Sequence, residues 1–168
     1  MKKAIFNTIH IILSITIGLF FINAGYKKLT SDKLKPIEKD QLIEYVISKN
    51  SYEAPVGYNV TMNTFKKSGF LDMISIFQIL AGILIVIPKS RLLGLLFLLP
   101  IIFNIFFMHV FFDNRMHENI ETGILLTICI LLISKYYKKI TPLLTVEYDD
   151  QSESNEKEKW FGRTTENK

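Results

Sequence analysis

Four apolar stretches, each long enough to cross a lipid bilayer, constrain this chain more than any other feature. They cover residues 4–25, 70–87, 92–112 and 119–137. A hydrocarbon core about 30 Å thick needs roughly 20 helical residues, because an α-helix rises about 1.5 Å per residue. The mean hydropathy of +0.25 is also high for a soluble domain of 168 residues. The sequence therefore predicts an all-α membrane protein, a bundle of four transmembrane helices.

The connections between these stretches predict which helices are neighbours. Residues 88–91 alone separate the second and third stretches, and residues 113–118 the third and fourth, so both should be antiparallel hairpins. Residues 26–69 form a long polar loop instead. Part of that loop has apolar residues at helical spacing after a proline: Leu42, Ile43, Val46 and Ile47. We expect a partly helical loop at the membrane surface or over the bundle, with a loosely ordered loop as the alternative.

The domain organisation follows from the change between the apolar stretches and the polar C-terminal segment. Residues 1–140 are predicted to form a single four-helix transmembrane domain, whose first helix is retained because its apolar stretch is too long for a signal peptide. Residues 141–168 are polar and acidic, which predicts a disordered tail.

Basic residues occur in pairs beside the apolar stretches, a pattern typical of helix ends at lipid headgroups and not of a nucleic-acid surface. The lipid bilayer is therefore an expected partner and nucleic acid is not. More of these residues lie near the N-terminus, in residues 88–91 between the second and third helices, and near the end of the fourth helix than on the other side. This bias predicts a multi-pass protein of the cell membrane, of the bacterial inner-membrane kind, with both termini in the cytoplasm.

Polar side chains inside the apolar stretches are candidates for function, because a polar group in hydrocarbon is costly without a partner. Gln78 and Asn104 lie at equal depth, about 12 Å from the outer end of their helices at 1.5 Å per residue, so they can share a hydrogen bond. This pair is either structural glue or part of a polar pocket for a ligand headgroup. A stripe along the first helix is more simply a packing seam: Asn7, His10, Ser14 and Gly18.

Each helix also places a polar side chain near the outer surface: Asn23, Asp72, His109 and Glu121. Asp113 stands one helical turn from His109 on the same face, and His117 and Glu118 follow in the hairpin. Such a set of acids and imidazoles could relay protons, hydrogen-bond a quinone-like headgroup or bind a divalent metal. Membrane ends collect polar residues in any case, and no tight ligand spacing such as HExxH occurs, so we predict no metal site.

Several short motifs lie between residues 4 and 140. They are Gly18-Leu19-Phe20-Phe21, Ala24-Gly25, Lys28-Leu29, Gly69-Phe70-Leu71, Gln78-Ile79-Leu80-Ala81-Gly82, Pro100-Ile101-Ile102-Phe103-Asn104-Ile105 and His109-Val110-Phe111-Phe112-Asp113. In these motifs the chain resembles the DoxX-like membrane proteins. The resemblance implies a four-helix bundle related to the small subunit of a thiosulfate:quinone oxidoreductase, in a group that also includes assembly or trafficking factors. Many relatives have a Glu where this chain has Gln78, which removes a titratable group.

These observations lead to one functional hypothesis and its rivals. We expect an accessory membrane subunit, without catalytic activity of its own, that binds a quinone-like molecule through Gln78, Asn104 and His109 and works with a membrane or redox protein. The alternative is a scaffold or assembly factor whose intramembrane polar residues are glue. A small-solute transporter is disfavoured, because four short helices without an inverted repeat leave little room for alternating access. No P-loop, dinucleotide fingerprint or nucleophile elbow occurs.

Overall fold

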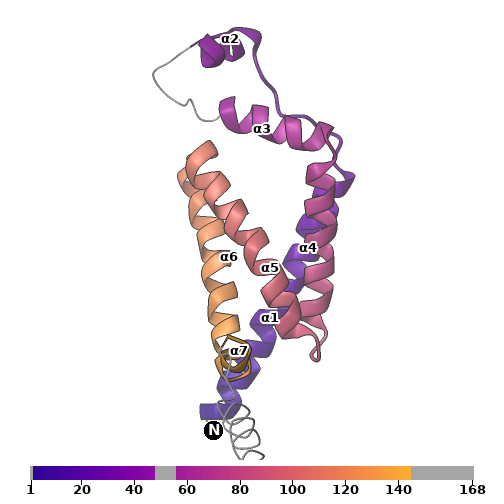
Figure 1. Ribbon diagram of the computed structural model, residues 1–168, viewed down its shortest axis with the longest axis vertical. Coiled ribbons are helices and arrows are strands. Elements are labelled where there is room, and N and C mark those ends of the chain that lie inside the picture. The colour runs from indigo at the N-terminus through magenta and orange to yellow at the C-terminus, as the bar shows by residue number, and fades with distance from the viewer. Residues whose placement is uncertain (1, 48–55, 145–168) are drawn as a thin grey trace, which may run out of the picture. The chain divides into compact units, whose positions relative to one another are not determined.

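The computed structural model describes residues 2–47 and 56–144, and every regular element in these ranges is a helix (Figure 1). The elements are α1 (Lys2–Thr30), α2 (Lys39–Ile47), α3 (Val56–Lys67), α4 (Phe70–Val86), α5 (Arg91–Met108), the π-helix η1 (His109–Asp113), α6 (Met116–Ser134) and α7 (Tyr137–Leu144). The predicted all-α class is confirmed. The chain divides into two units, Met1–Tyr136 and Tyr137–Lys168, and α7 belongs to the second.

Three helical segments are long and apolar enough to cross a membrane: Ala4–Thr30, Arg91–Asp113 and Met116–Ser134. The helix α4 meets the same test only together with α3, from which it is bent by 81°. The bend lies at Gly69, which adopts a left-handed backbone with φ of 77° that favours glycine. The described residues therefore contain three helices that are long and apolar enough to span a membrane, or up to four if the bent pair forms one span.

The helix boundaries differ from the predicted ones mainly at the helix ends. The helix α1 continues to Thr30 instead of ending near residue 25, and Lys27 and Lys28 in its last turn complement the negative end of the helix dipole. The predicted helical stripe in the long loop is confirmed as α2, whereas α3 was not predicted. Residues 141–144, expected in the tail, are helical in α7, and the remaining tail lies outside the described residues.

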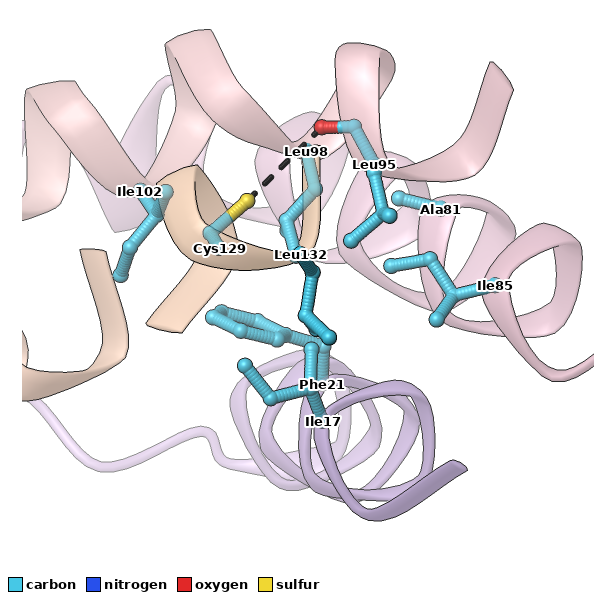
Figure 2. Packing of buried hydrophobic residues seen from close by; sticks show 9 residues of the cluster. All are labelled: Ile17, Phe21, Ala81, Ile85, Leu95, Leu98, Ile102, Cys129 and Leu132. Atoms are coloured by element: carbon cyan, nitrogen blue, oxygen red, sulfur yellow. Dashed lines mark hydrogen bonds between the residues drawn. The ribbon is translucent and has the colours of Figure 1, made fainter. Parts of the chain in front are cut away.

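The centre of the larger unit is a cluster of buried apolar side chains from α1, α4, α5 and α6 (Figure 2). Its members are Ile17, Phe21, Ala81, Ile85, Leu95, Leu98, Ile102, Cys129 and Leu132. The Cys129 thiol donates a weak hydrogen bond to the Leu95 carbonyl oxygen at 3.8 Å. Since lipid tails are as apolar as these side chains, close packing and not exclusion from water holds such helices together.

The closest helix contact joins α1 to α4 through glycines. A Cβ atom added to Gly82 would lie 2.6 Å from the Gly18 carbonyl oxygen, and one added to Gly18 would lie 2.9 Å from the Gly82 carbonyl oxygen. Farther along α1, a Cβ on Gly25 would lie 2.6 Å from the Ser75 carbonyl oxygen. The backbones of α1 and α4 therefore touch at Gly18, Gly25 and Gly82, and we call these three residues the glycine seam.

The predicted hairpins are confirmed, since α4 contacts α5 and α5 contacts α6. At the first hairpin, Arg91 is buried and its Nε donates to the Ile85 carbonyl oxygen at 3.0 Å, while Ser90 donates to the Leu84 carbonyl oxygen at 3.0 Å. Both bonds satisfy carbonyl groups that the end of α4 leaves without helical partners. Arg91, one of the basic residues beside the apolar stretches that were expected at lipid headgroups, thus caps the end of α4.

The polar stripe of α1 is a packing seam over part of its length. His10 and Ser14 are buried, and His10 Nε2 lies 3.2 Å from the Leu132 carbonyl oxygen of α6. Gly18 contacts α4 instead, and Asn7 is exposed. The stripe therefore joins α1 to two different neighbours.

Candidate functional site

A pocket of about 540 Å³ opens between α3, α4, α5 and η1. Phenylalanine is the most frequent residue type in its lining: Phe65, Phe70, Phe77, Phe107, Phe111 and Phe112. Two pairs of them are in contact, Phe65 with Phe70 at a centroid distance of 4.8 Å and Phe107 with Phe111 at 5.7 Å in a stacked arrangement. Aromatic walls of this kind suit a flat apolar ring. We call this cavity the aromatic pocket.

Two lining residues give the aromatic pocket its polar side-chain groups, Thr61 from α3 and Asn104 from α5. The Thr61 hydroxyl donates to the Gly57 carbonyl oxygen at 2.8 Å. Asn104 Nδ2 donates to the Pro100 carbonyl oxygen at 2.8 Å. A primary amide has two N–H donors and a carbonyl acceptor, so within the described chain Asn104 keeps one N–H and its Oδ1 for a ligand.

Gln78 does not belong to this pocket, and its predicted hydrogen bond to Asn104 is wrong. Gln78 is buried, and its Oε1 accepts a hydrogen bond from Lys28 Nζ at 3.1 Å. The two amides have different partners, because Gln78 turns toward α1 whereas Asn104 bonds a carbonyl of its own helix. The close approach at Gly25, whose added Cβ would lie 3.3 Å from Gln78 Cβ, brings the end of α1 beside this amide.

His109 is also outside the lining of the aromatic pocket and lies in a charged cluster at the end of α5. Its Nδ1 is 3.1 Å from Asp113 Oδ2, as the one-turn spacing predicted. The Asp113 side chain is fully buried. Arg115 donates two hydrogen bonds to the same carboxylate, from Nε to Oδ1 at 2.7 Å and from Nη2 to Oδ2 at 2.8 Å. Arginine pairs with carboxylates in this forked geometry, so the buried charge is neutralised.

The backbone around the cluster is shaped to hold it. The π-helix η1 ends at Asn114, which has a positive φ of 52° and whose N–H donates to the His109 carbonyl oxygen at 2.7 Å. The Tyr58 ring of α3 covers His109 at a centroid distance of 5.4 Å. The hydrogen bonds to Asp113 raise the pKa of the Arg115 guanidinium above its ordinary value, so Arg115 remains charged.

The other residues of the predicted outer polar layer are not brought into this cluster. Asp72 forms an ion pair with Lys66, with 2.8 Å between Oδ1 and Nζ. Asn23 and Glu121 are exposed, and neither side chain is bonded to another part of the described chain. Within the described ranges, no group of three or more His, Cys, Asp or Glu side chains is placed to hold a metal ion.

Three side chains that organise these sites were missed as functional candidates: Lys28, Tyr58 and Arg115. For Lys28 a signal existed, because helical side chains point back toward the N-terminus and a lysine just beyond a span can therefore reach into it. Arg115 lies two residues after the buried carboxylate in sequence, which was a weaker signal. Tyr58 lies far from His109 in the sequence, and no local pattern connects them.

No protein-family model, no curated protein and no solved structure matches this chain. Any function of this chain therefore rests on the geometry of its own residues. That geometry separates an aromatic pocket with one available amide from a charged cluster whose groups already bind one another.

Proposed function

We propose that this chain is a DoxX-like integral membrane protein with four spans, α4 being the second, and that it binds a lipid-soluble molecule of the quinone class in the aromatic pocket. The observation that carries the proposal is the pocket's composition, an aromatic wall with the Asn104 amide as a hydrogen-bonding group. A quinone has the same division, since its ring is flat and apolar and its carbonyl oxygens accept hydrogen bonds. Ligand pockets commonly combine an apolar wall with few polar groups that orient the ligand.

The roles of the lining side chains follow from their chemistry. Asn104 Nδ2 has a second N–H, which can donate to a quinone carbonyl oxygen while the first stays on Pro100. The stacked Phe107 and Phe111 rings provide faces for the quinone ring. Of the three residues expected to bind the ligand, Asn104 lines this pocket, whereas Gln78 and His109 support the surrounding helices.

The lining favours an accessory role over catalysis by this chain alone. Its side chains are Phe, Ile, Met, Pro, Thr and Asn, none of which is titratable or redox-active under ordinary conditions. A quinone reduced or oxidised here would exchange electrons with a separate membrane or redox protein. We further propose that both termini face the cytoplasm of a bacterial cell, as the basic residues near the N-terminus and α7 favour.

Thermal unfolding of the detergent-purified protein with menaquinone and ubiquinone analogues tests the proposal. A ligand that binds only the folded state stabilises it, by about 2.7 kcal/mol at a concentration 100 times its dissociation constant. We expect a saturable rise in Tm for wild type and none for Asn104→Leu. Asn23→Leu is the matched control, because Asn23 is exposed outside the pocket and the variant should keep the rise.

Loss of the rise in both variants, or its absence in wild type, would contradict quinone binding. The second outcome would favour the scaffold alternative, in which packing at the glycine seam is the main task of the bundle. Binding partners would then be sought among proteins of the same membrane.

A further inference from the structure

A second pocket, of about 290 Å³, lies at the C-terminal end of α1, where α3 and residues 31–35 form its other walls. Five lysines line it: Lys27, Lys28, Lys33, Lys35 and Lys66. No carboxylate is among the lining residues. Like charges around one hollow repel one another unless an anion lies between them. We call this cavity the lysine pocket.

Most of this positive charge is not neutralised by the protein within the described ranges. Lys66 is paired with Asp72 at 2.8 Å, but the other four lysines have no ion pair with a described carboxylate. Lys28, the most deeply placed, donates to the neutral amide of Gln78 at 3.1 Å. The pocket therefore keeps an excess of positive charge at the edge of a membrane span.

The walls of the lysine pocket are held in place by a second set of contacts. Asn63 of α3 bonds the backbone of Lys35 twice, its Oδ1 accepting at 2.7 Å and its Nδ2 donating at 2.9 Å. Asn59 Nδ2 donates to the Pro36 carbonyl oxygen at 3.1 Å. The Lys35 ammonium lies 6.0 Å from the centroid of the Tyr58 ring. The segment after α1 is thus fastened to α3, so the lysines converge before any ligand arrives.

A simpler explanation covers only part of the arrangement. Lysines in the last turn of a helix complement the helix dipole and extend toward water or headgroups, which accounts for Lys27 and Lys28. Lys33, Lys35 and Lys66 belong to other segments, yet they line the same hollow. Their convergence points to a ligand and not to the end of one helix.

We propose that the lysine pocket binds a phosphate-bearing anion, supplied either as the headgroup of an acidic phospholipid or as a free phosphate compound. Basic pockets between membrane helices are suited to phosphate headgroups, because several ammonium groups can share the phosphate oxygens. The site is separate from the aromatic pocket. The two lie along different faces of α3, with Tyr58, Met62 and Lys66 on one and Thr61 and Phe65 on the other.

Isothermal titration of the full chain in a neutral detergent tests this site with two probes, inorganic pyrophosphate and short-chain phosphatidic acid. The pocket variant is Lys33→Gln/Lys35→Gln, which removes two exposed lining charges. The control variant is Lys39→Gln/Lys67→Gln, which removes two exposed charges outside the lining. Thermal unfolding shows whether each variant is folded, and we expect both to unfold like wild type.

We expect saturable binding to wild type, weakened about 30-fold in the pocket variant and less than about threefold in the control. Binding of phosphatidic acid alone would identify a lipid headgroup as the source, and binding of pyrophosphate as well would identify free phosphate compounds. Equal weakening in both variants would show attraction to general surface charge and would overturn the proposal. So would the absence of saturable binding of either probe.

Discussion

Replacing Gly82 by alanine tests the glycine seam. Helix propensity alone predicts that this change stabilises the protein, whereas the structure predicts that it destabilises it. Alanine is a better helix former than glycine by up to about 1 kcal/mol, so an unconstrained site would gain stability. At Gly82, however, the new Cβ would lie 2.6 Å from the Gly18 carbonyl oxygen and 3.1 Å from the Ile22 backbone nitrogen. Backbone atoms cannot turn aside as a side chain can, so α1 and α4 must separate.

The magnitude follows from these opposing terms. Overpacking of a close contact costs about 1–3 kcal/mol, from which the propensity gain is subtracted. Because the new Cβ would meet backbone atoms, the upper end of that range applies, and we expect Gly82→Ala to lower the free energy of unfolding by about 2 kcal/mol. Gly123→Ala is the matched control, because its Cβ would meet only the Phe106 ring, whose nearest atom is 3.2 Å away and can tilt. That variant should stay within about 0.5 kcal/mol of wild type.

The unfolding of these variants can be followed through the reactivity of the chain's own cysteine. Cys129 is the single cysteine and is fully buried in the central cluster, so its thiol should react with a maleimide only after the bundle opens. The fraction of protected thiol is measured as the proportion of SDS in mixed micelles is raised. Gly82→Ala should lose protection at a lower proportion of SDS than wild type. Equal or greater stability of Gly82→Ala, with Gly123→Ala behaving like wild type, would refute close packing of α1 on α4.

Three further predictions concern the polar groups and the topology. Asp113→Asn should lower the free energy of unfolding in the same assay by about 2 kcal/mol, because it discharges a carboxylate held by charge-assisted hydrogen bonds, and unchanged stability would contradict this. Gln78→Leu should cost only about 0.6 kcal/mol, since Lys28 can turn toward the headgroups, and a loss above about 2 kcal/mol would show that the bond is essential. In intact cells, Lys89→Cys should resist an impermeant maleimide and His117→Cys should react, whereas the reverse pattern would place the termini outside.

Helix positions could be predicted from the sequence because length and hydropathy are local properties. The helix predicted at 70–87 has nearly the same bounds as α4, and the stripe after Pro36 lies in α2. The helix α3 was not predicted because its own sequence has no apolar run that indicates a helix. Its stabilising contacts are with α4 and η1.

The candidate site was predictable only where its geometry stays within one helix. His109 and Asp113 lie one turn apart, so their contact follows from helical periodicity. A prediction that Gln78 and Asn104 meet also needs the rotation of each helix about its own axis. The depth of the two residues along their helices does not give that rotation. The structure turns Gln78 toward Lys28 and leaves Asn104 at the aromatic pocket.

Photolabelling of the protein with an azido-substituted quinone in lipid nanodiscs tests the central claim most directly. After illumination and digestion, mass spectrometry locates the labelled side chains. The aromatic pocket predicts labels on its lining, such as Met73 of α4 and Met108 of α5, that unlabelled quinone suppresses and that weaken in Asn104→Leu. Labels spread along lipid-facing positions of α6 such as Ile124 and Leu131, and unaffected by competitor, would contradict a quinone site in this protein.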